Sequence, residues 1–263
     1  MIKLCVFDLG GTIVDKYSLS PFLSLKNAFK QNGIHINNSL LFKDMGKNKF
    51  DHINLILNDK YVSRNWLLKH GSYPGIKECE HVFSQFNEIQ LKQGLKDIRI
   101  LPETKQCFDL LGGNNILTAA TTGFNKDITM KIKDKLTEKD IYIHKYVSST
   151  CLNKPSRPFP HMINHIMDEL NVGEPNSVIK IDDTDVGIKE GLNAGCITVG
   201  VAKWSINMKM KTYEEAYILT EEEYNERLKY SRFSLNEAGA DYVIDSLTEL
   251  YPIIHKINSK KIY

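Results

Sequence analysis

The sequence has few cysteines, almost no net charge and no long apolar run, and each shortage excludes a class of protein. Its five cysteines among 263 residues are odd in number, widely spaced and free of CxxC pairs, so neither a disulfide framework nor a zinc site is expected. The 34 Lys and Arg nearly balance the 32 Asp and Glu, for a net charge of +2. That balance is far from the concentrated positive field of a nucleic-acid-binding protein.

The N-terminal segment lacks the features of a targeting or membrane-spanning sequence. No apolar run approaches the roughly 20 residues that cross a bilayer. Asp8 and Asp15 stand where a signal peptide would need its apolar stretch. Because unpaired cysteines suit a reducing compartment, we expect a cytoplasmic protein that binds neither membranes nor nucleic acid.

Six short apolar runs predict strands that alternate with helices. The first spans Ile2 to Phe7, and the others end near Ala120, Ser148, Ile181, Val201 and Ile244. Such runs are typical of parallel strands that are buried on both faces. Helical patterns lie between several of them, for instance over residues 160–173. The predicted fold class is α/β, with a doubly wound, mostly parallel, Rossmann-like sheet.

Residues 17–99 interrupt this alternation because they carry helical signals without convincing strands. Ser20 is a predicted N-cap with Pro21 at the first helical position, and Gly33 ends that helix. We therefore predict a core formed by residues 1–16 and 100–263, with residues 17–99 inserted as a helical cap. An insertion directly after the first strand would lie over the carboxyl ends of the strands, where ligands bind in open α/β sheets.

The turn after the first strand, "DLGGT", carries the first candidate site residues. Asp8 would stand at the strand end, facing the same space as the backbone N–H groups of the glycine turn. That placement suits a nucleophile attacking phosphorus, with the amides and Thr12 stabilising the charge that develops. The alternative is an Asp that merely caps a turn.

Two further strand ends carry groups that suit a phosphoryl ligand. Thr121, Thr122 and Gly123 follow the second strand, where they could hydrogen-bond a phosphoryl oxygen or simply cap a helix. In "KPSRPFP", Arg157 could make a bidentate contact to a phosphoryl group, and Lys154 is the rival cation.

A fourth strand end is acidic. Asp182, Asp183 and Asp185 follow the run "VIKI", and carboxylates suit a hard divalent cation such as Mg²⁺. A solvated acidic loop is the alternative. Nucleophile, hydroxyl, cation and carboxylate at four successive strand ends are together far more specific than any one of them.

In this order the motifs "DLGGT", "TTG", "SRPFP" and "DDT" resemble those of the haloacid dehalogenase superfamily. The resemblance implies an aspartyl-phosphate mechanism in which Asp8 is the nucleophile and Thr122 and Arg157 hold the phosphoryl group. It also implies Mg²⁺ bound by Asp8, Asp183 and the backbone carbonyl of Gly10.

Gly10 departs from the pattern of phosphatases in that superfamily, which usually carry a second Asp two residues after the nucleophile. Without that general acid, typically worth about 10²- to 10⁴-fold in rate, either the hydrolase is weakened or its leaving group is activated differently. The phosphonoacetaldehyde hydrolase family has a small residue there and breaks a carbon–phosphorus bond, using a cap lysine that forms a Schiff base with the aldehyde.

The segment "DMGKNKFDHINLIL" of the cap resembles the lysine segment of that family. If the whole segment is helical, Met45, Lys49 and His52 share one face, and the apolar residues Phe50, Ile53 and Leu57 form a stripe beside it. The resemblance implies that Lys49 forms the imine and that His52 transfers a proton or orients the imine nitrogen. Considered alone, the lysines of this segment would be a solvated face.

Two departures from the family concern the metal site. Asp182 stands where the family commonly has Gly, and Gly187 stands where it commonly has a second Asp. Loss of that carboxylate is expected to weaken Mg²⁺ binding, and Asp182 and Asp185 are the two candidates to compensate for it. Leu9, next to the nucleophile, replaces a bulkier family residue.

The resemblance covers nearly the whole chain and predicts a Mg²⁺-dependent hydrolase that converts phosphonoacetaldehyde to acetaldehyde and phosphate. It also implies a homodimer assembled partly through the cap. Two alternatives stay open: an enzyme for another phosphonate or phosphorylated aldehyde, and a non-catalytic protein that only binds a phosphorylated ligand.

Overall fold

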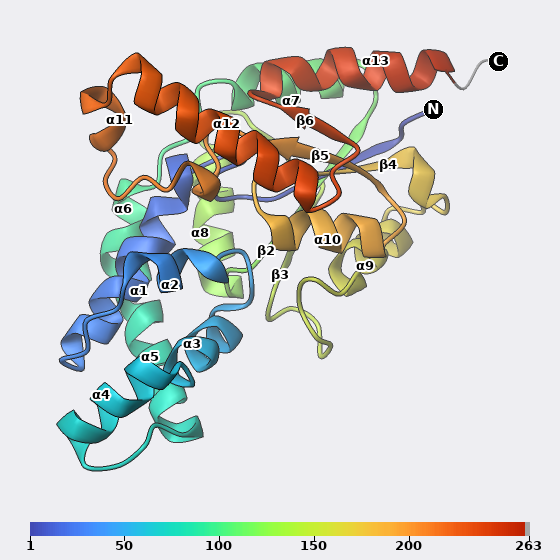
Figure 1. Cartoon of the computed structure of the whole chain (residues 1–263). Helices are drawn as coiled ribbons and strands as arrows, with labels where there is room; N and C mark the ends of the chain where they lie inside the picture. The colour runs from blue at the N-terminus through green and yellow to red at the C-terminus, as the bar shows by residue number, and fades with distance from the viewer. Residues whose placement is uncertain (261–263) are drawn as a thin grey trace.

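A six-stranded parallel sheet forms the centre of the computed structural model, which describes residues 1–260 (Figure 1). The strands are β1 (Leu4–Phe7), β2 (Leu117–Thr122), β3 (Lys145–Ser148), β4 (Val178–Asp182), β5 (Ile197–Val201) and β6 (Tyr242–Ile244). Their order is β3-β2-β1-β4-β5-β6, and every neighbouring pair is parallel. The predicted α/β class and all six predicted strands are confirmed. The last residues of the predicted core, 261–263, lie outside the described residues.

Helices cover both faces of the sheet, as the alternation of β1 requires. Cys5 and Phe7 pack into one apolar cluster, which also holds side chains of α7, α8 and α13, whereas Leu4 and Val6 pack into another with α9. The helices of this part are α7 (Thr104–Gly113), α8 (Lys126–Thr137), α9 (His161–Glu169), α10 (Asp185–Asn193), α11 (Glu215–Ile218), α12 (Glu221–Glu237) and α13 (Leu250–Lys260). Within residues 1–260, no helix has the length and apolarity that a membrane crossing needs.

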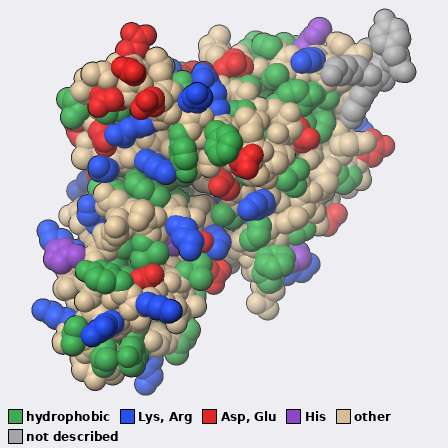
Figure 2. Space-filling model, in the orientation of Figure 1, with side chains coloured by type: hydrophobic (Ala, Val, Ile, Leu, Met, Phe, Trp, Pro, Cys, Tyr) green, Lys and Arg blue, Asp and Glu red, His purple; other side chains and the backbone are tan. Residues whose placement is uncertain are grey.

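The segment between β1 and α7 is helical and projects to one side of the sheet (Figure 1). It contains α1 (Leu19–Gln31), α2 (Asn38–Lys43), α3 (Lys49–Leu57), α4 (Lys60–His70), α5 (Ile76–Ile89), the π-helical turn η2 (Gln90–Gly94) and α6 (Leu95–Asp97). Figure 2 shows the lower part of this segment as a lobe distinct from the rest of the molecule. We keep the name cap for residues 17–99.

The two chain segments that enter and leave the cap lie side by side. Val14 and Ile100 form an antiparallel bridge, and the Asp15 backbone N–H donates to the Arg99 carbonyl at 2.8 Å. Backbone pairing at Val14 and Ile100 thus joins the two chain segments that connect the cap to the core.

The first cap helix does not begin as predicted. It starts at Leu19 with Ser18 as its N-cap, and Ser20 lies inside its first turn, so the predicted cap at Ser20 is wrong. The reason is that a residue outside the helix supplies the acceptor: both carboxylate oxygens of Asp15 accept from the Ser20 backbone N–H, at 3.1 and 3.2 Å. Gly33 follows the helix with a φ of 70°, as expected of a residue that ends one.

Candidate active site

Asp8 lies directly after β1, between the ends of β2 and β4, because β1 pairs with both of these strands. Its side chain is buried, and burial raises its pKa to about 6. A small pocket opens over it between sheet and cap. The pocket is lined by Asp8, Gly10, Ser18, Pro21, Met45, Gly46, Lys49, Thr122, Gly123, Phe124, Arg157 and Thr184.

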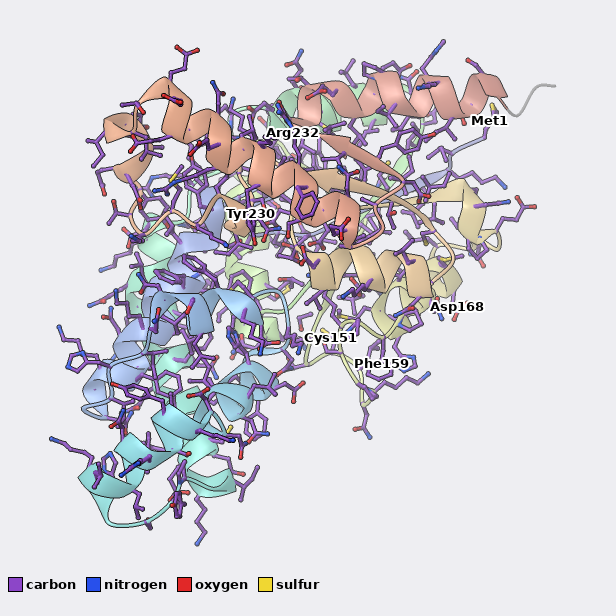
Figure 3. All side chains as sticks on the ribbon, in the orientation of Figure 1. Met1, Cys151, Phe159, Asp168, Tyr230 and Arg232 are labelled. Atoms are coloured by element: carbon purple, nitrogen blue, oxygen red, sulfur yellow. The ribbon has the colours of Figure 1, made fainter. Side chains whose placement is uncertain are left out.

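Arg157 is the cation that reaches this pocket. Its Nη1 donates to Asp8 Oδ1 at 2.7 Å, and its Nη2 donates to the Thr121 carbonyl at 2.7 Å. Lys154, the rival candidate, is exposed. The loop that carries Arg157 joins β3 to α9, and the exposed Cys151 and Phe159 mark its outer surface in Figure 3.

Three carboxylates meet at the ends of β1 and β4. Oxygens of Asp8, Asp182 and Asp183 lie within 4.8 Å of one another, and all three residues are buried. Burial, followed by the charges of Asp8 and Asp182, raises the pKa of Asp183 well above its ordinary range. Asp182 Oδ2 lies 3.0 Å from Lys180 Nζ, yet it makes no hydrogen bond within residues 1–260. Buried, crowded carboxylate oxygens with spare lone pairs fit a hard divalent cation.

The balance of buried charges near the pocket also favours a divalent cation. Four buried carboxylates, Asp8, Asp182, Asp183 and Glu190, surround two buried cations, Arg157 and Lys180. With all four carboxylates ionised and Lys49 neutral, two negative charges would be uncompensated. Burial, together with this unfavourable excess, is the reason that the pKa values of Asp8 and Asp183 are raised. A divalent cation would neutralise the two charges.

The Asp182 carboxylate lies directly against the backbone of Gly187. A Cβ built on Gly187 would lie 1.9 Å from Cγ and Oδ2 of Asp182, so the Asp182 carboxylate fills the place into which a side chain at 187 would project. Asp185 does not point there, because its carboxylate accepts from Asn207 Nδ2 at 3.3 Å and from Ser234 Oγ at 3.2 Å. The geometry favours Asp182 as the group that compensates for Gly187.

Lys49 is the first residue of α3 and lines the pocket. Only 5% of its surface is exposed, and burial lowers its pKa from 10.5 to about 8. Its Nζ donates to the Lys47 carbonyl at 3.4 Å. A buried lysine of this kind holds a substantial share of neutral, nucleophilic amine near pH 8.

The helix around Lys49 is shorter than predicted. Met45 lies in the turn before α3 rather than on it, so the predicted single helical face of Met45, Lys49 and His52 is wrong. The helix begins at Lys49 because the side chain of Asn48 accepts from the Phe50 backbone N–H at 2.8 Å and caps it. Met45 nonetheless lines the same pocket as Lys49.

His52 lies one turn further along α3 and is fully buried. It is absent from the residues that line the pocket, and neither ring nitrogen has a hydrogen-bond partner within residues 1–260. Burial, followed by the charge of Lys49, holds its pKa well below the ordinary range. His52 is therefore a neutral imidazole close to Lys49 in the chain.

The cap touches the core through glycine backbone. A Cβ on Gly123 would lie 2.8 Å from the Lys47 carbonyl oxygen, so only a glycine admits this approach. Thr122 lines the pocket beside Gly123. Thr12, by contrast, does not line it: its hydroxyl donates to Asp183 Oδ1 at 3.3 Å.

Ser18 of the cap lies next to Gly10, the position at which phosphatases of the superfamily carry an Asp. A Cβ on Gly10 would lie 3.2 Å from Ser18 Oγ, and both residues line the pocket. Ser18 has a φ of 49°, a left-handed conformation that is strained for a serine. The space next to Asp8 thus carries a hydroxyl instead of a carboxylic acid.

Two of the charged residues closest to Arg157 were not predicted from the sequence. Lys180 and Glu190 are both completely buried and lie 3.2 Å apart. A sequence signal existed for Lys180, since a lysine in the middle of the buried run "VIKI" must find a partner inside the protein. Nothing in the spacing of Glu190 distinguished it from a solvated glutamate on a helix.

The sheet order and the four strand-end groups define the class of this protein. A family model described as haloacid dehalogenase-like hydrolase matches residues 2–195, and the chain belongs to that family. Within it, the chain is a phosphonoacetaldehyde hydrolase-like enzyme, as the comparisons with individual proteins show. The predicted family and enzyme class are confirmed.

Two curated relatives and one solved structure illustrate the similarity. The phosphonoacetaldehyde hydrolase of Latilactobacillus sakei is 31% identical, with 97% of this chain and 96% of the relative covered. That of Paraburkholderia phytofirmans is 30% identical, with coverages of 98% and 96%. A crystal structure of a phosphonoacetaldehyde hydrolase-like protein from Oleispira antarctica superposes with a TM-score of 0.93 at 29% identity, covering 98% of this chain and 93% of that one.

Proposed function

We propose that this enzyme cleaves the carbon–phosphorus bond of phosphonoacetaldehyde, giving acetaldehyde and phosphate through a Schiff base on Lys49 and an aspartyl phosphate on Asp8. The observation that carries the proposal is the pairing of two features in one pocket. A buried lysine with a pKa of about 8 lines the same space as a nucleophile turn that has Gly10 in place of a general acid.

Lys49 would act first. Its neutral amine attacks the aldehyde carbon, and loss of water leaves a protonated imine that withdraws electrons from the adjacent carbon. His52, a neutral imidazole one turn along α3, is the proposed proton carrier for this exchange. The low pKa of Lys49 supports the step, because only the unprotonated amine attacks a carbonyl.

Asp8 would act second. Its carboxylate oxygen attacks phosphorus while the electrons of the carbon–phosphorus bond move into the imine, forming an enamine. No alkoxide leaves, so no general acid is needed at Gly10. Arg157 Nη1, 2.7 Å from Asp8 Oδ1, would bind a phosphoryl oxygen, and Thr122 and Gly123 line the same side. Water then hydrolyses the aspartyl phosphate, and protonation and hydrolysis of the enamine release acetaldehyde.

Asp8, Asp183 and the carbonyl of Gly10 would hold Mg²⁺, with Asp182 contributing the further carboxylate beside them. The metal would supply charge that lets an anionic nucleophile approach an anionic phosphonate. The crowding of three buried carboxylates and the hydrogen bond from Thr12 to Asp183 support this assignment.

The decisive experiment combines product analysis with trapping. The Mg²⁺-loaded protein is incubated with phosphonoacetaldehyde while phosphate and acetaldehyde are measured, and a parallel sample is reduced with borohydride for peptide mass analysis. We expect both products and an adduct on Lys49, and neither in Lys49→Arg, which cannot form an imine. Turnover that persists in Lys49→Arg would contradict the imine mechanism, and a wild type that binds phosphate without turnover would favour a binding-only role.

We also propose that two copies of the chain associate through their caps. Large apolar side chains are exposed on α4, in the loop after it and at the start of α5: Tyr61, Leu68, Tyr73 and Ile76 are each at least 60% exposed. Exposed apolar side chains that lie together on a surface commonly mark an interface. Sedimentation of the wild type and of Leu68→Glu tests this, since a charge at the most exposed of these positions should shift a dimer toward monomer. A cytoplasmic location stays a prediction.

A further inference from the structure

Glu190 is a buried carboxylate that the proposed chemistry does not use. It lies on α10, is completely buried, and faces the sheet rather than the pocket. Its Oε2 accepts from Arg157 Nε at 2.8 Å and from Thr121 Oγ1 at 3.0 Å, and lies 3.2 Å from Lys180 Nζ. Oε1 has no hydrogen-bond partner in residues 1–260. One oxygen thus gathers three partners from three different elements.

Thr121 completes this arrangement. Its hydroxyl accepts from Lys180 Nζ at 2.7 Å and from Arg157 Nη2 at 2.7 Å, and donates to Glu190 Oε2. One donor and two acceptor sites are all that a threonine hydroxyl offers, so the group has no freedom to rotate. Glu190 Oε1 is left without a partner in residues 1–260, but every hydrogen bond of the Thr121 hydroxyl joins it to a buried charged group, so a rearrangement would leave a buried charge unpaired.

The consequence falls on Arg157, whose guanidinium is planar and has a fixed fork of donors. Glu190 holds the Nε edge, and the carbonyl and hydroxyl of Thr121 hold Nη2. Only Nη1 is left to face Asp8 Oδ1. The plane of the guanidinium is therefore set from the side opposite the pocket.

We propose that Glu190, acting with Lys180 and Thr121, is a positioning residue that fixes Arg157 Nη1 where the phosphoryl group is held. The inference rests on the proposed function, since it assumes that Arg157 binds that group. Lys180 has its own part in this arrangement. Residues 180 and 182 of β4 point to the same face of the sheet, so Lys180 joins Glu190 to the carboxylate of Asp182, 3.0 Å from its Nζ.

The test separates phosphoryl binding from imine formation. Glu190→Gln keeps the size of the side chain and removes its charge. Binding of inorganic phosphate to the Mg²⁺-loaded protein is measured by calorimetry. Reaction of Lys49 with acetaldehyde, which has no phosphoryl group, is measured by borohydride trapping. We expect phosphate to bind roughly 10- to 100-fold more weakly, with trapping unchanged.

Thr198→Val is the matched control for a loss of stability alone. Thr198 is also completely buried, and its hydroxyl bonds to Asp241 on the β5–β6 side of the sheet, away from Arg157. If phosphate binds Glu190→Gln and Thr198→Val equally well, the positioning role is wrong. A drop in both phosphate binding and trapping in Glu190→Gln would likewise reduce Glu190 to a structural residue and overturn the proposal.

A second pair of variants decides the question if Glu190→Gln fails to fold. Thr121→Ser keeps the hydroxyl, and Thr121→Val removes it at nearly constant volume. We expect the serine variant to bind phosphate like the wild type and the valine variant to bind it more weakly. Equal affinities would overturn the proposal. A wild type that releases no acetaldehyde while Thr121→Val still weakens phosphate binding would contradict the proposed function and leave the positioning role standing.

Discussion

The ionisation of Lys49 gives the sharpest quantitative test of this site. Burial lowers its pKa from 10.5 to about 8. At pH 7, roughly one lysine in ten is then a neutral amine, against about three in ten thousand for an ordinary lysine. Burial therefore raises the nucleophilic fraction about 300-fold, and the neutral form increases further as the pH rises toward 8.

The assay is the rate of borohydride trapping of acetaldehyde on Lys49 as a function of pH. We expect the rate to rise with pH, to reach half its maximum near pH 8, and to level off above that. Asp8 does not confuse the assignment, because its pKa of about 6 places its own ionisation lower. Lys47→Gln is the control, since Lys47 pairs with Asp44 at 2.6 Å and is partly exposed.

Three results would refute the reasoning. A midpoint above pH 10 would mean that the amine is solvated and that α3 does not bury it. A flat profile between pH 6 and 10 would mean that the neutral amine does not limit the reaction. Trapping that disappears in Lys47→Gln but persists in Lys49→Arg would show that the imine forms on Lys47.

Four further predictions concern the core side of the pocket. Gly187→Ala should destabilise the protein by about 1 to 3 kcal/mol because its Cβ meets the Asp182 carboxylate; thermal unfolding measures this, and an unchanged Tm contradicts it. The exchange of Asp182→Gly with Gly187→Asp should restore Mg²⁺ affinity relative to Asp182→Gly alone, measured by calorimetry. Arg157→Lys should lower kcat/KM about 10²-fold, because a lysine cannot span Asp8, Glu190 and Thr121 at once. Chelation with EDTA should abolish phosphate release, and added Mg²⁺ should restore it; full activity after exhaustive chelation would argue against a metal.

The sequence allowed the strand ends to be predicted because parallel strands place their carboxyl ends at one edge of a sheet. The order of the strands along the chain therefore predicts that Asp8, Thr122 and Asp183 lie close together. Arg157 was harder, since it lies on a loop, and Lys154 was a rival cation on the same loop. The burial of Arg157 beside Asp8, with Lys154 exposed, agrees with the choice of Arg157.

These errors and omissions share one physical cause, which is that the decisive partner lies in a different structural element. The predicted cap at Ser20 was wrong because Asp15 reaches the helix from outside. Glu190 was not predicted because its partners lie on β2, on β4 and on the loop of Arg157. Gly187 lies on α10 and Asp182 at the end of β4, and the close approach of the two depends on how the helix packs against the strand. The pattern of residue types does not predict that packing.

The bridge between Val14 and Ile100 has a consequence for how the enzyme can change. The two ends of the cap are held together by backbone pairing next to the core. The distance that the cap must span between its ends is therefore as short as in a tight turn. The entropy of closing a loop grows only with the logarithm of its length, so doubling the segment beyond this pairing would cost the sheet about 0.6 kcal/mol. The residues of the cap can therefore be replaced together, while the register of β1 and Asp8 at its end stay as they are.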